Sequence, residues 1–305
     1  MNSGWLPVGA AAATSAVLLF AAQPDSPGGM LLAVLATLPL FLVGLSWGLF
    51  HGAASGAAAS IAILGAVSVS AGLYYGLVNA LPAALLMWQA ERSPARPGRL
   101  VMTLTACAAA PIIVAALYFG MREGGLEGAV RAQLEPLLTG AVTDTSGTMP
   151  PEWSAFVETF AGLFPALAAT FWALLIAVNG ALAQGLLRRF GKNRLPSPDI
   201  AAVRVPRWML GVFAAILGLS ALTGGFGYLA NNLVPVAALP FFFAGLALMH
   251  WALRRSGAPG LWLGLLYGLL IVFGWPAAIL MLIGLADTIF DFRGRAGPPP
   301  ASPAV

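Results

Sequence analysis

Long apolar runs separated by short polar links limit what this chain can fold into. Runs of about 20 apolar residues recur between residues 6 and 290, and a hydrocarbon core about 30 Å thick needs about 20 helical residues to cross it. Only 9% of the residues are charged. Backbone groups in lipid must also pair within a helix or a closed barrel. The pattern therefore predicts an all-α, polytopic transmembrane helical bundle embedded in a lipid bilayer.

The apolar runs set the expected number of membrane segments. We expect helices at about 6–22, 30–50, 52–70, 72–90, 100–120, 156–187, 208–229 and 232–253, and then an apolar stretch at 261–290. Proline is poorly accommodated inside a helix, so Pro276 favours a hairpin of two short helices, hinged at Gly274-Trp275-Pro276, over one long span. About 8–10 membrane segments follow, with 6–22 as an uncleaved first helix because no basic residue precedes it.

Domain organisation follows from the absence of any long polar stretch. With a mean hydropathy of +0.87, residues 1–295 are expected to form a single integral-membrane domain with an outer loop at about 121–155. The tail 296–305 contains Pro298-Pro299-Pro300 and is expected to be disordered.

Basic residues collect in alternate links between the runs. Thirteen of the 15 Lys and Arg residues fall there: Arg92, Arg96, Arg99, Arg188, Arg189, Lys192, Arg194, Arg204, Arg207, Arg254, Arg255, Arg293 and Arg295. The positive-inside bias places these links and both termini in the cytoplasm. Basic residues beside apolar runs meet lipid headgroups, so nucleic acid is not an expected partner. One Lys against fourteen Arg, with abundant Ala, Gly and Pro, hints at a GC-rich bacterial genome and hence an inner membrane.

Tryptophan and acidic residues support the same orientation. Six Trp residues fall near the predicted inner boundary: Trp5, Trp47, Trp88, Trp208, Trp251 and Trp262. Interfacial Trp belts of this kind anchor helices at headgroup depth. The outer segment carries five acidic residues: Glu123, Glu127, Glu135, Asp144 and Glu152.

A short amphipathic helix is expected in that outer segment. Its apolar stripe has a spacing of four residues: Leu126, Val130, Leu134 and Leu138. Glu127, Arg131 and Glu135 have the same spacing on another face and can form supporting ion pairs. Such a helix would lie in the outer membrane interface.

Polar aromatic and amide side chains near the predicted outer ends of helices form the candidate binding site. They are Tyr74, Tyr75, Asn79, Tyr118, Tyr228, Asn231 and Asn232. Aromatic walls with a few amides can orient a small ligand. The alternative is an outer aromatic belt with helix caps, and further amides within the spans, such as Asn179 and Gln184, can hold helices together.

A stripe of small residues spaced by four, which we call the glycine stripe, crosses the second and third runs. It consists of Gly44, Gly48, Gly52, Gly56 and Ser60. Small residues on one helix face let helix backbones approach closely. The stripe could dock a partner helix, or it could serve ordinary packing within the chain.

Nothing in the sequence predicts catalysis, a cofactor or a metal site. Ala53-Ala54-Ser55-Gly56 comes close to the rhomboid protease motif and His250 follows it, but the first glycine of that motif is missing. Asp287 is the only carboxylate expected inside a span, near the inner boundary and paired with Arg293 or another Arg. No nucleotide-binding or zinc-protease motif is present. We therefore expect a protein that is not an enzyme.

The stretch Gly284-Leu285-Ala286-Asp287-Thr288-Ile289-Phe290-Asp291-Phe292-Arg293 resembles the closing signature of the YybS-like family of bacterial predicted multi-pass membrane proteins. Residues 242–250, Phe-Phe-Ala-Gly-Leu-Ala-Leu-Met-His, resemble the preceding helix of that family. The resemblance implies a multi-pass domain of unknown function with Gly284, Asp287, Asp291 and Arg293 as signature residues. The family is distantly similar to the substrate-binding subunits of energy-coupling-factor vitamin transporters. Residues 38–52 are similar to the early helices of those subunits, and no binding residue is carried over.

Two functions follow from these observations. The first is a small-solute-binding membrane subunit of an uptake transporter, without its own ATPase, energised by partner membrane proteins. The alternative is an envelope scaffold or assembly protein that holds division or wall-synthesis proteins through its helix faces.

Overall fold

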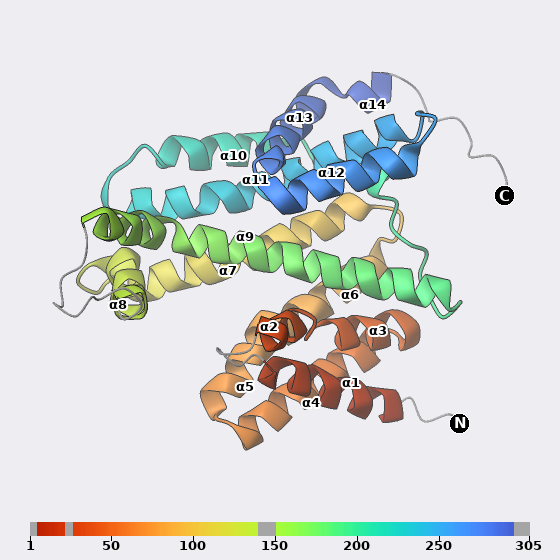
Figure 1. The fold of residues 1–305 in the computed structure, drawn as a ribbon, viewed down its shortest axis with the longest axis horizontal. Coiled ribbons are helices and arrows are strands. Elements are labelled where there is room, and N and C mark those ends of the chain that lie inside the picture. The colour runs from red at the N-terminus through yellow and green to blue at the C-terminus, as the bar shows by residue number, and fades with distance from the viewer. Residues whose placement is uncertain (1–4, 22–26, 140–150, 296–305) are drawn as a thin grey trace. The chain divides into compact units, whose positions relative to one another are not determined.

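The structure, a computed structural model, describes residues 5–21, 27–139 and 151–295. Within these ranges the chain is helical and has no strand (Figure 1). The helices are α1 (Trp5–Phe20), α2 (Pro27–Val34), α3 (Leu38–Trp47), α4 (Leu49–Ala66), α5 (Val69–Tyr75), the π-helix η1 (Gly76–Ala80), α6 (Leu81–Arg92), α7 (Pro97–Phe119), α8 (Gly125–Thr139), α9 (Pro151–Arg189), the 3₁₀-helix η2 (Ile200–Ala202), α10 (Trp208–Leu219), α11 (Gly224–Leu253), α12 (Pro259–Phe273), α13 (Pro276–Phe290) and α14 (Phe292–Arg295).

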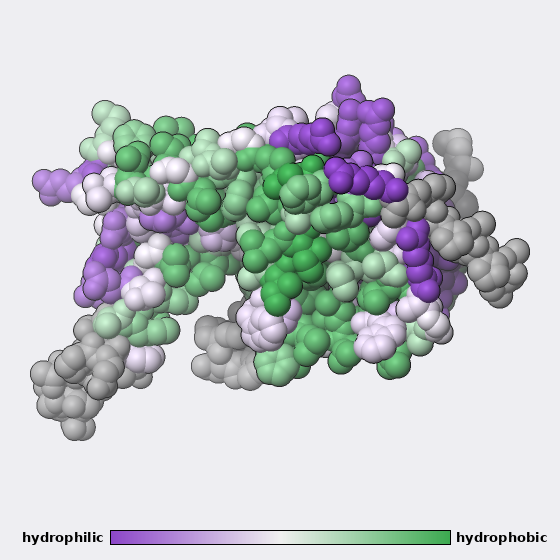
Figure 2. All heavy atoms as spheres, turned by 90° about the horizontal axis from the view of Figure 1, so that it is seen from above, coloured by the Kyte–Doolittle hydropathy of each residue, from purple (hydrophilic) through white to green (hydrophobic). Residues whose placement is uncertain are grey.

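The helix lengths confirm the predicted polytopic all-α bundle. Among the described residues, five helical stretches are long and apolar enough to cross a membrane: Leu49–Ala66, Val69–Arg92, Pro97–Phe119, Ala155–Arg189 and Gly224–Leu253. Five shorter apolar helices accompany them. Large hydrophobic side chains such as Leu117 and Ile271 are 75% and 83% exposed, and hydrophobic residues cover broad areas of the surface (Figure 2). Lipid is the solvent that accommodates such a surface.

The helices group into two compact units. The first unit consists of Met1–Leu104 with Ala173–Asp199, and the second of Thr105–Trp172 with Ile200–Val305. The helices α7 and α9 each contribute residues to both units.

A glycine hairpin organises the first unit. The helices α3 and α4 are joined at Gly48, whose φ of +102° is open to glycine but unfavourable for other residues. Gly44 and Gly52 then face each other, because a Cβ built on Gly52 would lie 2.7 Å from the Cα of Gly44. The thioether of Met87 covers both glycines. The helix α1 packs against this α3–α4 hairpin.

The central helix of the second unit is α11. In its most apolar window 61% of residues are buried, against 22–28% in the other four long spans. The helix α13 packs along α11 at two glycines: a Cβ on Gly245 would lie 1.9 Å from the carbonyl oxygen of Leu280, and a Cβ on Gly284 would lie 1.8 Å from that of Phe241. The predicted hairpin of short helices is confirmed, because α12 ends at Gly274 with φ +67° and α13 begins at Pro276.

Two predicted boundaries were wrong. The helix expected at 208–229 ends at Leu219, and α11 begins at Gly224 rather than at residue 232. Gly224 has φ +73° and supplies the turn, so Asn231 and Asn232 lie inside α11 rather than at a helix end. The helix expected at 30–50 is also interrupted, and it divides into α2 and α3.

The predicted outer helix is present as α8. Arg131 pairs with Glu127 at 3.0 Å and with Glu158 at 3.3 Å. These hydrogen bonds, with Glu127 first, raise the pKa of Arg131 above its ordinary value. Leu126 and Leu134 of the apolar stripe are buried, while Asp144 lies outside the described residues. The position of α8 in an outer membrane interface stays a prediction.

Candidate functional site

The interruption between α2 and α3, which we call the α2–α3 break (residues 35–37), is surrounded by polar side chains of the first unit. In the break the N–H groups of Leu35, Ala36 and Leu38 bond to carbonyls three residues earlier, which is the tighter 3₁₀ pattern. Pro39 has no N–H to offer. Side chains from α1 and α9 bond the carbonyl groups that an uninterrupted helix would have used.

Ser15 and Tyr75 form a hydrogen-bonded relay to this break. The hydroxyl of Ser15 donates to the carbonyl of Ala36 and also bonds the hydroxyl of Tyr75. A serine hydroxyl has one hydrogen, so Tyr75 is the donor to Ser15. Both side chains are fully buried. The relay therefore uses both hydroxyl hydrogens on groups within the chain.

Asn179 of α9 approaches the break from another direction. Its Nδ2 donates to the carbonyl of Val34 at 2.8 Å and to that of Leu175 at 2.9 Å. These two contacts fix the orientation of the amide, because the flipped form would place Oδ1 against two carbonyl oxygens. The Oδ1 atom is buried and has no hydrogen-bond partner among the described residues.

Thr37, which lies in the break itself, carries a second buried polar atom without a partner among the described residues. It precedes the first residue of α3, a position where a threonine side chain commonly caps the helix, but its φ of −85° and ψ of −14° are helical and its hydroxyl makes no cap. Thr37 is 3% exposed, and its Oγ1 has no partner within the described chain. Buried polar groups are nearly always bonded, so two such atoms at one helix break indicate a candidate site.

In the second unit, two predicted site residues repair a proline-induced defect in α9. Pro165 cannot donate to the carbonyl of Ala161, and the hydroxyl of Tyr228 donates to that carbonyl at 2.9 Å. Asn232 bonds the next donor and acceptor along α9, Ala166 and Gly162, which are four residues apart. Its Oδ1 accepts from the N–H of Ala166 at 2.9 Å, and its Nδ2 donates to the carbonyl of Gly162 at 3.0 Å. Neighbouring helices commonly satisfy such freed groups in membranes.

The other predicted site residues have different surroundings. Tyr74 is 62% exposed, as is Tyr118, and Arg122 donates to the hydroxyl of Tyr118 and stacks over its ring. Asn79 lies half-buried in η1 and Asn231 is exposed on α11. Tyr74, Tyr75 and Asn79 belong to the first unit, and the remaining four residues belong to the second. One pocket formed by all seven stays a prediction.

The glycine stripe is divided by the turn at Gly48. A Cβ on Gly48 would lie 2.1 Å from Nη1 of Arg194, and that guanidinium pairs with Glu91 at 2.9 Å. The same carboxylate accepts from the N–H of Leu49. Gly44 and Gly52 face each other, and a Cβ on Gly56 would lie 2.8 Å from that of Ala80. At these positions the structure shows packing within the chain, and docking of a partner helix stays a prediction.

The signature residues Asp287, Asp291 and Arg293 form ion pairs and hydrogen bonds at the end of α13. The predicted pair is present: Nη2 and Nε of Arg293 donate to Oδ2 of Asp287 at 2.7 and 3.0 Å, with each side chain 3% exposed. Nη1 of Arg293 donates to the carbonyl of Ala201 at 2.7 Å. Asp291 ends the helix with φ +50° and pairs with Arg204. The pair between Arg204 and Asp291 and the hydrogen bond from Arg293 to Ala201 connect the end of α13 to residues 201–204.

The residues of the protease-like motif are also engaged. Ser55 donates to the carbonyl of His51 in its own helix at 2.8 Å. His250 bonds the carbonyl of Leu246 through Nδ1 and lies 3.3 Å from the hydroxyl of Tyr267 through Nε2. Within the described residues no group of three His, Cys, Asp or Glu side chains could hold a metal ion.

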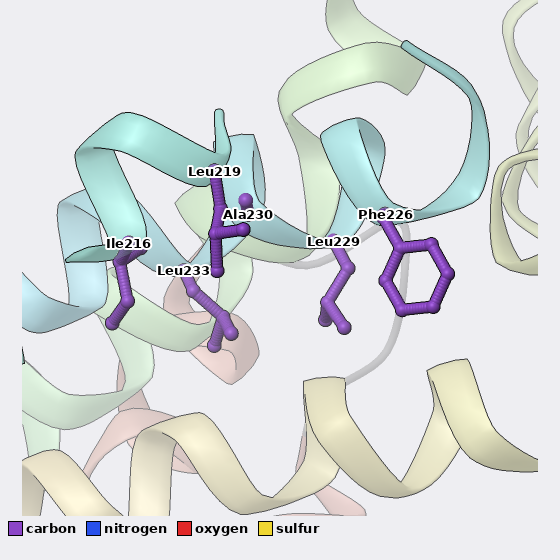
Figure 3. Close-up of a pocket in the computed structure, with 6 residues that line it drawn as sticks. All are labelled: Ile216, Leu219, Phe226, Leu229, Ala230 and Leu233. Carbon is purple, nitrogen blue, oxygen red and sulfur yellow. The ribbon is translucent and has the colours of Figure 1, made fainter. Parts of the chain in front are cut away.

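A small apolar hollow lies between α10 and α11 (Figure 3). Its volume is about 80 Å³, and it is lined by Ile216, Leu219, Phe226, Leu229, Ala230 and Leu233. Ligand pockets for small molecules are several times larger and contain polar groups. None of the predicted site residues lines it, and it suits a lipid chain rather than a polar solute.

Sequence reasoning missed Ser15 and Thr37. Single hydroxyl residues in apolar helices are common, and neither residue is distinguished by spacing. Pro39, two residues after Thr37, is the one local signal of an interrupted helix.

Comparison with known families gives one result. A family model described as predicted membrane protein (DUF2232) matches residues 13–288. Gly284 and Asp287 lie within the match, and Asp291 and Arg293 lie beyond its end. Neither the curated proteins nor the solved structures give a match.

Proposed function

We propose, for a chain that belongs to the DUF2232 family of predicted membrane proteins, that it is a non-enzymatic membrane subunit that binds a small solute for uptake. It would act in a bacterial inner membrane with its basic links in the cytoplasm, and partner membrane proteins would supply the energy. The similarity of residues 38–52 to early helices of energy-coupling-factor substrate-binding subunits supports this role.

The α2–α3 break is the observation that carries the proposal. Irregular backbone at membrane depth is tolerated only where it is buried in protein or lines a cavity. Transporters use such discontinuous helices to build substrate and ion sites near the bilayer midplane. Here the break combines an interrupted helix with two buried polar atoms, Thr37 Oγ1 and Asn179 Oδ1, that have no partner in the described chain.

Counting along the helices from the predicted inner boundary supports a position of the break near the middle of the bilayer. Thr37 precedes Trp47 by ten residues, and Ser15 follows Trp5 by ten, so each lies about 15 Å from the predicted inner boundary at 1.5 Å per residue. Asn179 precedes Arg188 by nine residues, which gives about 14 Å. Half of a hydrocarbon core about 30 Å thick is the same depth.

A ligand screen on purified protein tests the proposal. We expect a small solute to raise the thermal unfolding temperature of the wild type, because a ligand that binds only the folded state stabilises it. Tyr75→Phe should weaken that effect by removing the hydroxyl that bonds Ser15. Tyr74→Phe is the matched control, because Tyr74 is exposed, and it should respond like the wild type.

Two results would count against the uptake role. If no solute in the screen stabilises the wild type, the proposed binding of a small solute is contradicted. Co-purification with division or wall-synthesis proteins, rather than with an ABC-type ATPase, would favour the alternative of an envelope scaffold.

A further inference from the structure

We propose that the α2–α3 break holds a monovalent cation of the size of Na⁺, coordinated by Thr37 Oγ1, Asn179 Oδ1 and the carbonyl oxygens of Val34 and Ala36.

Most hydrogens at the break are already used. Both hydrogens of the Asn179 amide bond carbonyl groups. The hydrogen of Ser15 bonds Ala36, and the hydrogen of Tyr75 therefore bonds Ser15. What remains is the hydrogen of the Thr37 hydroxyl and a larger number of lone pairs, on Asn179 Oδ1, on Thr37 Oγ1 and on the two carbonyls, each of which keeps one acceptor site after accepting a single bond.

A cluster of lone pairs attracts a cation or a hydrogen-bond donor and disfavours an anion. Unwound carbonyls and the C-terminal ends of half-helices coordinate coupling cations in transporters. Val34 is the last residue of α2, so its carbonyl lies at such an end, where the helix dipole is negative. Neutral oxygens suffice, and neither Asp nor Glu is among the four coordinating residues.

Close packing limits the occupant to a small ion. Ala36 within the break is 2% exposed, and Leu40 and Tyr75 beside it are both 0% exposed. The break itself therefore accommodates one ion, and the proposed solute would bind beside it rather than within it. The inference therefore extends the proposed function from a solute to an ion that binds beside it, and the ion site does not require the solute.

Sodium binding to solute-free protein is the direct test. Purified protein in detergent is exchanged into choline chloride and titrated with NaCl at constant ionic strength, and bound ²²Na⁺ is counted. We expect saturable binding that approaches one ion per chain and an unfolding temperature that rises with Na⁺ concentration. KCl at the same concentrations should produce a clearly smaller rise.

Three variants locate the site. Thr37→Val removes the hydroxyl at nearly constant volume and should abolish both the ²²Na⁺ binding and the Na⁺-dependent shift. Thr37→Ser keeps the hydroxyl and should retain both. Thr288→Val is the matched control, because Thr288 is a buried hydroxyl of the second unit that bonds the carbonyl of Gly284, and it should bind Na⁺ like the wild type.

The outcomes separate the two proposals. Equal unfolding temperatures in Na⁺ and choline, with no bound ²²Na⁺ on the wild type, would mean that water alone occupies the break and would overturn the ion site. Undiminished binding by Thr37→Val would overturn it as well, and Thr37→Ala replaces that variant if it does not fold. Sodium binding with a negative solute screen would reject the solute-binding role and leave the ion site standing.

Discussion

Removing the guanidinium of Arg293 should destabilise the second unit strongly. Two of its nitrogens donate to one oxygen of Asp287 at 2.7 and 3.0 Å, and a third donates to the carbonyl of Ala201 at 2.7 Å. Both charged side chains are 3% exposed, so Arg293→Met leaves a carboxylate buried without its cation. Breaking a buried pair in this way costs about 3–5 kcal/mol.

A double variant separates the stability that the ion pair contributes from the cost of leaving one buried charge without a partner. Buried pairs replaced on both sides by apolar groups are often neutral or stabilising, so Asp287→Leu with Arg293→Met should be more stable than Arg293→Met alone. Arg204→Met is the control, because it removes an exposed partner of Asp291 and should change stability little.

The assay is chemical unfolding of purified protein in detergent, followed by tryptophan fluorescence. We expect Arg293→Met to be less stable than both the wild type and the double variant. A single variant as stable as the wild type, or less harmful than the double variant, would refute the assignment of a buried ion pair.

Three further changes have defined outcomes. Arg204 hydrogen-bonds Asp291 and holds the pKa of that carboxyl below its ordinary value of 3.8. The stability from this pair is therefore present above the pKa of the unfolded state and is lost as the pH falls through the pKa of the folded state. In Arg204→Gln the unfolding temperature should fall less steeply as the pH is lowered through this range. Gly48→Ala places a side chain at φ +102° and should cost at least about 1–3 kcal/mol in unfolding free energy, whereas Gly65→Ala, with open space around its Cβ, should be neutral or slightly stabilising. Tyr228→Phe removes the donor to a carbonyl freed by a proline and should cost about 1 kcal/mol in the same unfolding assay.

Hydropathy and proline placement were sufficient to predict much of the fold. The apolar runs correspond to helices because lipid requires each long run to satisfy its own backbone. The hairpin at Pro276 was predictable, since proline is favoured at the start of a helix and Gly274 can adopt the positive φ that ends the preceding one. The pair between Asp287 and Arg293 was also predictable, because a lone carboxylate in a span needs a nearby cation.

Boundaries inside continuous apolar sequence were not predictable in the same way. The turn before α11 depends on Gly224, which is one of 36 glycines. The α2–α3 break lies in a run with no charged residue, so the hydropathy pattern shows no interruption there. Asn232 was expected at a helix end because the predicted helix began at residue 232, but it lies within α11 and bonds a helix whose contacting residues are 66 and 70 positions away. Such partners follow from tertiary packing, which a local pattern does not contain.

Two buried asparagines differ in the one feature on which we base the proposed binding role of Asn179. In Asn232 the Oδ1 atom accepts one hydrogen bond and the Nδ2 atom donates two, all to backbone groups. Asn179 also donates twice to carbonyls, but its Oδ1 is left without a donor among the described residues. The residue type is the same and both side chains are buried, so neither property distinguishes the two roles. The unpaired Oδ1 of Asn179 is what distinguishes the two residues. A buried acceptor without a partner carries a desolvation cost that an ion or a ligand can remove.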